Sequence, residues 1–209
     1  MSFGNALHRP FTDWKKLGIG ALVTLVPILN FATFGYALRC ANTKKDDLPD
    51  WSEFGELWVS GIVALIISLI YAIPYMIIMF ATVGTAMMSA FSGSGSMMFG
   101  TLGGGMLITV LVGLLTFYIA PVAVLRANRE GFGAAFHFGD VFRNAFTGTY
   151  FMAWFLGMVG SLILIFAGWL AFFLLALTLI LMPIGFLAYM AAIWAANVTA
   201  WTLIGEAVD

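Results

Sequence analysis

The stretch Tyr150–Gly205 contains no Asp, Glu, Lys or Arg. A helix needs about 20 mostly apolar residues to cross roughly 30 Å of hydrocarbon, so this stretch is long enough for two crossings. The whole chain is similar, with 62% hydrophobic and 9% charged residues, whereas soluble domains have about 45–50% and about 25%. A compact domain of 209 residues cannot bury so much apolar surface. The composition excludes a soluble domain, a nucleic-acid-binding protein and a disordered chain, and indicates a polytopic membrane protein.

Hydrophobic segments make up most of the chain. We predict five of them, over Leu17–Leu38, Leu57–Met88, Gly105–Leu125, Tyr150–Leu181 and Ile184–Leu203. Pro27 and Asn30 interrupt the first segment, and the last boundary is placed at Met182–Gly185 because Pro and Gly interrupt helices most strongly. The uncharged, Gly- and Ser-rich stretch Phe91–Gly104 is typical of a flexible linker. We therefore expect an all-α, polytopic transmembrane helical bundle.

The connections Arg39–Glu56 and Arg126–Asn144 carry most of the charge. Each predicts a short amphipathic helix, the first of them beginning after Pro49, a favourable first helical residue. The apolar faces would hold Trp51, Phe54, Leu57 and Trp58 in the first helix, and Ala134, Phe138, Val141, Phe142 and Ala145 in the second. Amphipathic helices beside membrane spans usually lie in the interface. Their aromatic residues are predicted interfacial anchors: Trp51, Phe54, Trp58, Phe138 and Phe142. A solvated loop is the alternative.

The two halves of the chain resemble each other. Leu38-Arg39-Cys40-Ala41-Asn42 ends the first segment and Leu125-Arg126-Ala127-Asn128 ends the third. A charged connection and a long apolar segment follow in both halves. We expect a single integral membrane domain over residues 1–209, with parallel repeat units over 17–90 and 105–181 and a final segment over 184–203. The alternative is chance similarity, since short matches arise easily in apolar sequence.

Two topologies agree with the charge pattern. Five crossings place six of the nine Lys and Arg residues in the two charged connections on one side, and the N-terminal three on the other. The positive-inside rule then puts both connections in the cytoplasm and the N-terminus outside. If the first segment instead turns back at Pro27 and Asn30, all nine cations share one side. The repeat favours five crossings.

Nothing in the sequence indicates catalysis. All ten Asp and Glu residues lie in connections or termini, His8 and His137 are far apart, and the single Cys40 excludes an intrachain disulfide and a multi-cysteine metal site. The sequence contains neither a P-loop nor a nucleophile elbow. We predict no enzymatic activity, no cofactor and no metal. The lack of ionisable residues deep in a segment also disfavours proton-coupled transport.

Small and amide side chains mark the expected helix contacts. Alanine recurs every four residues in the last segment, and Gly157 and Ser161 form a similar pair in the fourth. Such stripes allow close approach of helices, within the chain or between subunits, and Asn30 and Asn197 could hydrogen-bond across helices. The packing or interface candidates are Ala188, Ala192, Ala196, Ala200, Gly157, Ser161, Asn30 and Asn197.

Several motifs in the first third of the chain resemble a known family. They are Trp14–Gly20 (WKKLGIG), Gly35–Arg39 (GYALR), Leu48–Trp51 (LPDW), Phe54, Gly61 and Ile70–Pro74 (IYAIP). They are similar to the DUF4013 family, an uncharacterised, largely archaeal family of multi-pass membrane proteins. The resemblance covers most of the chain, although the later half is similar only in hydropathy. It implies a prokaryotic cytoplasmic membrane setting and no particular activity.

Two functional hypotheses follow. The first is a non-catalytic assembly or accessory subunit of a membrane complex, whose partners are the lipid bilayer and either a second copy or another membrane subunit, with no nucleic acid. The alternative is a transporter or channel component for a small solute or ion, suggested by the prolines that interrupt the segments, Pro27, Pro74 and Pro183.

Overall fold

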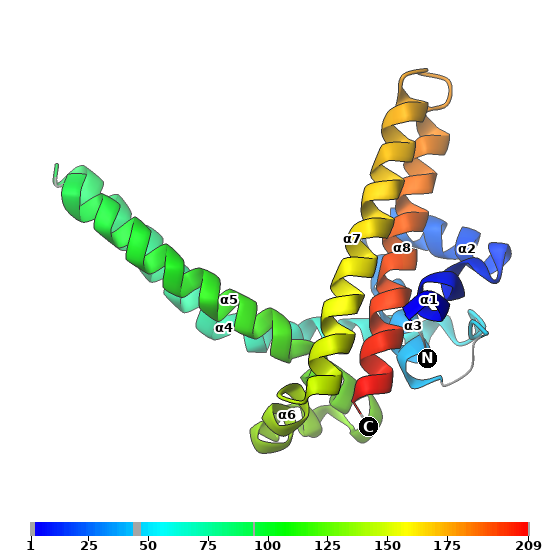
Figure 1. Cartoon of the computed structure of the whole chain (residues 1–209), viewed down its shortest axis with the longest axis horizontal. Coiled ribbons are helices and arrows are strands. Elements are labelled where there is room, and N and C mark those ends of the chain that lie inside the picture. The colour runs from blue at the N-terminus through cyan, green and yellow to red at the C-terminus, as the bar shows by residue number, and fades with distance from the viewer. Residues whose placement is uncertain (1–2, 44–46, 94, 209) are drawn as a thin grey trace. The chain divides into compact units, whose positions relative to one another are not determined.

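The computed structural model describes residues 3–43, 47–93 and 95–208, and helices are the only regular secondary structure within these ranges (Figure 1). Lys44, Lys45 and Asp46 of the first charged connection lie outside them. The elements are α1 (Phe3–His8), η1 (Arg9–Phe11), α2 (Trp14–Leu25), α3 (Asn30–Asn42), α4 (Phe54–Phe91), α5 (Gly95–Glu130), η2 (Phe132–Phe136), α6 (Phe138–Ala145), α7 (Gly148–Ala176) and α8 (Met182–Ala207). The predicted all-α fold is confirmed.

Four described helices are long and apolar enough to cross a membrane: α4, α5, α7 and α8. The predicted polytopic bundle is therefore confirmed. The first predicted segment, 17–38, is divided between α2 and α3, which have 12 and 13 residues. At 1.5 Å per residue each is roughly 18–20 Å long, shorter than the roughly 30 Å of hydrocarbon. Pro27 lies between them, where its ring and missing N–H prevent a continuous helix.

The chain forms two compact units. The first unit comprises Met1–Leu65 and Val122–Asp209, and the second comprises Ile66–Pro121. Helices α4 and α5 each contribute residues to both units. The first unit holds all the charged residues, since residues 66–121 contain none.

In the second unit, α4 and α5 pack through glycines. A Cβ atom on Gly105 would lie 2.5 Å from Thr82, and one on Gly113 would lie 3.1 Å from Tyr75. The predicted flexible linker over Phe91–Gly104 is wrong, because α4 ends at Phe91 and α5 begins at Gly95. Glycine lets a neighbouring membrane helix approach closely, as Gly105 and Gly113 do here, whereas Gly100, Gly103 and Gly104 lie in α5 without such a contact.

Helices α7 and α8 lie side by side (Figure 1), packed through small residues. Gly157 faces Ala200, and a Cβ at Gly157 would lie 3.3 Å from the Ala200 Cα. The Ser161 hydroxyl donates to the Ala196 carbonyl at 3.1 Å, and Gly168 lies against Ala192. The structure places these predicted packing residues at a contact within the chain.

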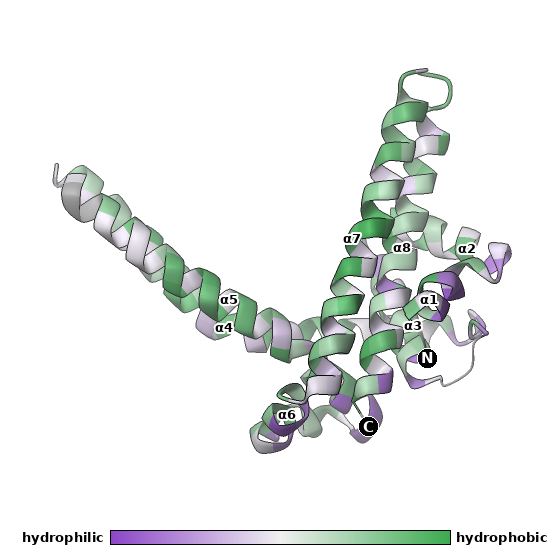
Figure 2. Cartoon of the chain, in the orientation of Figure 1, coloured by the Kyte–Doolittle hydropathy of each residue, from purple (hydrophilic) through white to green (hydrophobic). Residues whose placement is uncertain are grey.

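The boundary between α7 and α8 differs from the predicted one. We expected Pro183 to interrupt the helix, but it occupies the first turn of α8, where its missing N–H would have no helical partner. The turn lies over residues 177–181. Figure 2 shows hydrophobic residues along most of both helices.

The core of the first unit lies where α2 and α3 pack on α8. Trp194 of α8 is fully buried among side chains of α2, α3, the connection before α4 and the start of α4: Leu17, Tyr36, Cys40, Leu48 and Leu57. Gly20 lies directly against the Trp194 ring. Gly35 and Gly61 bring α3 and the start of α4 into backbone contact, at Leu57 and Phe31 respectively.

Candidate functional site

Charged side chains of the first unit fasten the ends of its helices to one another. We call this set the polar collar: Arg9, Lys16, Arg39, Arg126 and Arg129, with the acids and carbonyls that they bind. Three of the motifs that resemble the DUF4013 family, WKKLG, GYALR and LPDW, meet there. The collar is the main concentration of polar contacts among the described residues, so it is the candidate site.

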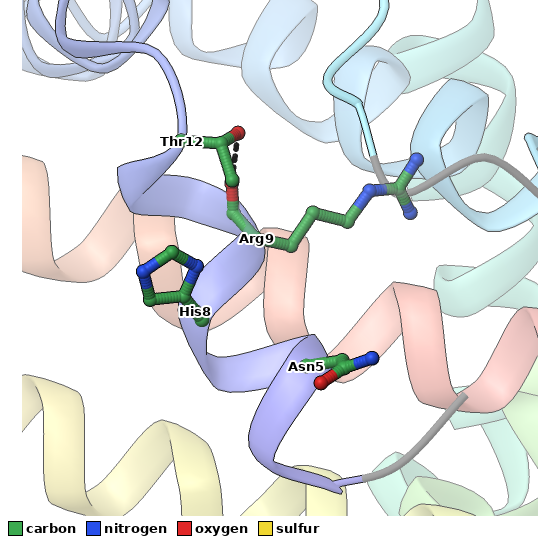
Figure 3. Close-up of a pocket in the computed structure, with 4 residues that line it drawn as sticks. All are labelled: Asn5, His8, Arg9 and Thr12. Carbon is green, nitrogen blue, oxygen red and sulfur yellow. Dashed lines mark hydrogen bonds between the residues drawn. The ribbon is translucent and has the colours of Figure 1, made fainter.

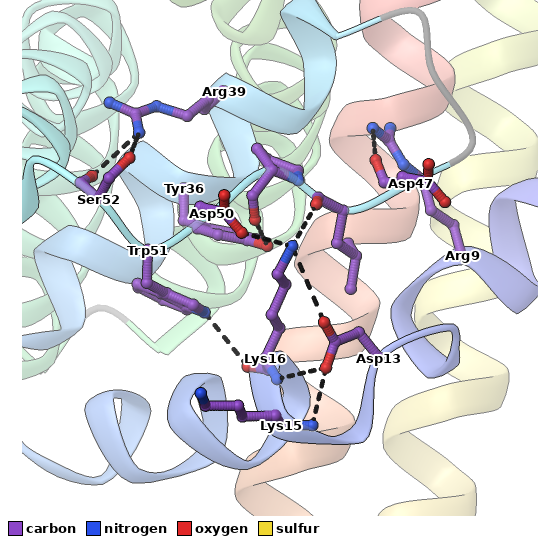
Figure 4. A network of polar contacts seen from close by, with 12 residues as sticks. Arg9, Asp13, Lys15, Lys16, Tyr36, Arg39, Asp47, Asp50, Trp51 and Ser52 are labelled. Carbon is purple, nitrogen blue, oxygen red and sulfur yellow. Dashed lines mark hydrogen bonds and ion pairs between the residues drawn. The ribbon is translucent and has the colours of Figure 1, made fainter.

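Lys16 joins α2 to the connection before α4 (Figure 4). Its Nζ atom lies 2.8 Å from Asp50 Oδ1 and donates to the Leu48 carbonyl at 2.7 Å. Asp13 is the N-cap of α2 and accepts from the backbone N–H groups of Lys15 and Lys16. The hydrogen bond and charge of Lys16 lower the pKa of Asp50. This cation therefore holds the LPDW motif against α2.

Trp51 completes the attachment of this connection. Its ring stacks on Tyr36 at a centroid distance of 4.1 Å, and its Nε1 donates to the Lys16 carbonyl at 3.2 Å. The Tyr36 hydroxyl donates to the Pro49 carbonyl at 2.7 Å. The separate amphipathic helix predicted after Pro49 is not formed, because residues 49–53 are held in a non-helical path by these contacts and α4 begins at Phe54. Trp51 is a packing residue of this cluster.

Arg9 is almost fully buried, with 1% of its surface exposed. Its Nη1 donates to the Cys40 carbonyl at 3.0 Å and to Thr202 Oγ1 at 2.9 Å. Its Nη2 donates to the carbonyls of Thr43 and Asp47 at 3.3 and 3.2 Å. One guanidinium thus joins the N-terminal region, the end of α3, the following connection and α8. Burial raises the pKa of the neighbouring Cys40 thiol to about 12.

A small open pocket of about 250 Å³ lies beside Arg9, lined by Asn5, His8, Arg9 and Thr12. Figure 3 shows the Arg9 side chain extending away from His8 and Asn5. Its guanidinium binds protein carbonyls instead. The position of this cation therefore follows from the collar and does not indicate an anion-binding pocket.

The corresponding arginines of the two similar motifs have similar roles. Arg39 lies 3.0 Å from Glu53 and 3.8 Å from Glu56, in the connection that follows its helix. Arg126 lies 2.7 Å from Glu130 and 3.5 Å from Asp140, again in residues that follow it. The motif asparagines also meet: Asn42 Nδ2 donates to Asn128 Oδ1 at 2.6 Å. These matched contacts favour the predicted internal repeat, which stays a prediction.

Arg129 closes the other end of the collar. Its Nε donates to Asn42 Oδ1 at 2.8 Å, its Nη2 donates to the Gly205 carbonyl at 2.7 Å, and its Nη1 donates to the Val208 carbonyl. The last carbonyls of a helix lack intrahelical partners and carry partial negative charge. Arg129 therefore caps the C-terminal end of α8.

The remaining predicted anchors lie on partly exposed surface. Phe138 and Phe142 are 55% and 43% exposed, whereas Val141 and Ala145 on the same short helix, α6, are fully buried. The two phenylalanines therefore lie off the buried side of α6. Phe54 begins α4 and is also exposed. Trp58 donates from Nε1 to the Ile28 carbonyl at 2.8 Å.

The two asparagines do not join helices in the described part of the chain. Asn30 Oδ1 accepts from the Thr33 hydroxyl, and Asn197 Nδ2 donates to the Ile193 carbonyl one turn earlier in α8. Both side chains therefore bond locally. Ala188, the remaining packing candidate, is half-buried in α8.

A stripe of hydroxyl residues on α4 was not recognised in the sequence. It consists of Ser68, Tyr71, Tyr75, Thr82, Thr85, Ser89 and Ser92, spaced by three, four or seven residues. Tyr75 and Thr82 lie against the Gly113 and Gly105 positions of α5, and Thr82 Oγ1 lies 3.5 Å from Thr109 Oγ1. The hydroxyls of Thr82 and Thr109 therefore lie between α4 and α5, whereas Thr85 of the same stripe is exposed. Spacings of three, four and seven residues place side chains on one face of a helix, and this pattern could have identified the stripe in the sequence.

Lys16→Met is expected to raise the pKa of Asp50 towards its ordinary value. Because Lys16 holds this pKa low, the ion pair stabilises the fold at neutral pH, and its contribution is lost as pH falls through the lowered pKa. Titration of the Asp50 carboxyl by NMR in detergent micelles measures the shift. Lys15→Met is the control, since Lys15 binds Asp13 through its backbone N–H. Identical titrations in both variants would contradict the Lys16–Asp50 contact.

The side chains of the collar connect neighbouring elements of the first unit. No group of three or more His, Cys, Asp and Glu side chains that could hold a metal occurs among the residues described. Its cations bind carboxylates, carbonyls and amides of neighbouring elements. These contacts orient helix ends, and they assemble no nucleophile and base.

Comparison with known proteins gives a single family. The model of a family described as "Protein of unknown function (DUF4013)" matches residues 19–173. No curated protein and no solved structure shows significant similarity to the chain.

Proposed function

This chain belongs to the DUF4013 family, and from that premise we propose that it is a non-catalytic assembly or accessory subunit of a membrane complex. The four apolar helices make it a multi-pass membrane protein. Its proposed location is the cytoplasmic membrane of a prokaryote. Its proposed partners are lipid and either a second copy or another membrane subunit.

The polar collar carries this proposal. All five arginines of the chain bind groups of the chain itself, from Arg9 on backbone carbonyls to Arg143 on Asp140 at 3.1 Å. Charges used in this way order helix ends and do not form a reactive cluster. Helix ends held by such contacts suit a protein whose role is to hold others in place.

The membrane-facing surface supports an assembly role. Exposed, mostly aromatic side chains follow one another along α7: Phe151, Phe155, Leu162, Phe166, Trp169 and Phe173. Trp169 stacks with Phe166 and Phe173 at centroid distances of 6.2 and 5.7 Å. Aromatic residues are enriched in protein interfaces. We propose that a neighbouring subunit packs against this stripe.

The mass of the protein in mild detergent tests the assembly. We expect size exclusion with light scattering to give a multimer or a complex with a co-purified subunit. Replacing Phe166 and Trp169 by alanine should reduce the mass towards the monomer, whereas Leu111→Ala and Leu114→Ala on exposed positions of α5 should not. A lone monomer without any co-purified protein would contradict the proposal.

The hydroxyl stripe favours a second candidate, a channel or transporter component. Hydroxyls facing inward can coordinate a small solute without ionisable side chains. On this hypothesis, vesicles with the protein show solute or ion flux that Thr82→Val and Thr109→Val reduce. Thr178→Val, in the turn before α8, is the control. Equal flux in vesicles with and without the protein would contradict it.

A further inference from the structure

We propose that residues 14–42, comprising α2, the turn at residues 26–29 and α3, form a wedge that enters one leaflet of the membrane from the cytoplasmic side and turns back within it. Lipid acyl chains cover the turn, and both ends of the wedge lie at the cytoplasmic surface. The inference is independent of the assembly proposed above.

The charge of the wedge is confined to its two ends. Asp13, Lys15 and Lys16 lie at the start of α2, and Arg39 lies in the last turn of α3. No charged residue occurs between Lys16 and Arg39. A continuous crossing would place these two ends on opposite sides of the membrane. The ends instead meet the same connection, since Lys16 binds Asp50 and Arg39 binds Glu53.

The turn presents apolar surface on the side opposite the protein core. Gly20, Ala21 and Thr24 are buried on the α8 side of α2. The exposed large hydrophobic side chains at and before the turn are Leu22, Leu25, Val26, Ile28 and Leu29, of which Ile28 is 67% exposed. This surface adjoins α8, which is long and apolar enough to span the membrane. Acyl chains around α8 are therefore the matching occupant.

Three backbone carbonyls of the turn accept hydrogen bonds from groups of the protein. The Val26 carbonyl accepts from Asn30 N at 2.9 Å, and the Leu29 carbonyl accepts from Ala32 N at 2.8 Å. The Ile28 carbonyl accepts from the Trp58 indole at 2.8 Å. Irregular backbone at membrane depth requires such internal partners. The Trp58 indole thus supplies a hydrogen-bond donor to a carbonyl that would find no water in hydrocarbon.

The wedge also places all the Lys and Arg residues on one side of the membrane. With α4, α5, α7 and α8 as the spans, all nine Lys and Arg residues of the sequence precede α4 or lie between Arg126 and α7. The sequence between α4 and α5 and the turn at 177–181, which would lie on the opposite side, carry no charge. The positive-inside rule assigns the charged side, and with it both termini, to the cytoplasm.

Cysteine labelling of the full chain in cell membranes tests the wedge. Single substitutions Lys15→Cys, Ile28→Cys, Leu25→Cys and Thr178→Cys are treated with a membrane-impermeant maleimide in right-side-out and inside-out vesicles. The native Cys40 gives little background, because it is buried and its thiol pKa is raised to about 12. A fluorophore on Ile28→Cys is also measured in vesicles of acyl-chain-brominated phospholipid.

We expect Lys15→Cys to react only in inside-out vesicles and Thr178→Cys only in right-side-out vesicles. Ile28→Cys and Leu25→Cys should react in neither until the membrane is dissolved in denaturing detergent, and brominated lipid should quench the fluorophore. Reaction of Lys15→Cys from outside would overturn the wedge in favour of a crossing. Reaction of Ile28→Cys in inside-out vesicles, or a fluorophore that brominated lipid does not quench, would show that water or protein covers the turn and would also overturn it.

Discussion

Gly35→Ala is expected to lower the thermal unfolding midpoint of the protein in detergent by at least about 5 °C. Gly35 of α3 lies so close to α4 that an added Cβ atom would overlap the Leu57 carbonyl. A backbone carbonyl in a helix cannot rotate away as a flexible side chain can, so α3 and α4 would have to separate. Overpacking of this kind costs about 1–3 kcal/mol or more, and 1 kcal/mol corresponds to about 2–4 °C in a chain of this size.

The same substitution at Gly18 is the matched control. Gly18 lies in α2, and no atom lies within 4 Å of the position that its Cβ would take. Alanine favours a helix by about 1 kcal/mol over glycine. Gly18→Ala should therefore leave the midpoint unchanged or raise it slightly. Equal midpoints for the two variants would show that α3 and α4 are not in contact at Gly35.

Arg9→Met is expected to destabilise the first unit by about 3 kcal/mol or more, because the buried guanidinium donates to three carbonyls and a hydroxyl. The methionine would leave the carbonyls of Cys40, Thr43 and Asp47 without this donor. Buried acceptors without partners each cost about 1–3 kcal/mol. Denaturant titration in detergent, followed by tryptophan fluorescence, measures the loss.

Two variants separate the geometry of Arg9 from its charge. Arg9→Lys keeps the charge, but an ammonium lacks the planar guanidinium that reaches four acceptors. The free energy of unfolding of Arg9→Lys should therefore lie between those of the native protein and Arg9→Met. Arg143→Met removes an exposed arginine whose pair with Asp140 is solvated, and should cost less than about 1 kcal/mol. If Arg9→Met unfolded at the same denaturant concentration as Arg143→Met, the collar would not hold the N-terminal region in place.

Hydropathy was sufficient to predict the long helices, because an apolar stretch such as Tyr150–Gly205 identifies membrane segments from composition alone. The α7–α8 contact was also foreseeable, since residues such as Gly157 and Ala200 follow the spacing of a helix face. Element boundaries were less accurate. Pro183 lies in the first turn of α8, where its missing N–H has no helical partner, and Gly100 lies inside α5, so neither residue type ends a helix at every position.

The collar could not be derived from sequence spacing. Lys16 and Asp50 are distant in the chain, and Trp51 leaves the expected amphipathic face because the Tyr36 ring offers a better contact. Such pairings exist only once α2, α3 and α8 are packed together. Asn197 illustrates the converse: an amide in an apolar segment suggests an interhelical bond, but a carbonyl one turn away satisfies it.

The uncharged connections of the α4–α5 and α7–α8 pairs have a consequence for how the chain is inserted into the membrane. Neither the sequence between Phe91 and Gly95 nor the turn before Met182 contains a charged residue. Translocating an ionised side chain through hydrocarbon is the costly step in threading a loop across a bilayer. Each pair can thus enter the bilayer as a helical hairpin without carrying an ionised side chain through the hydrocarbon.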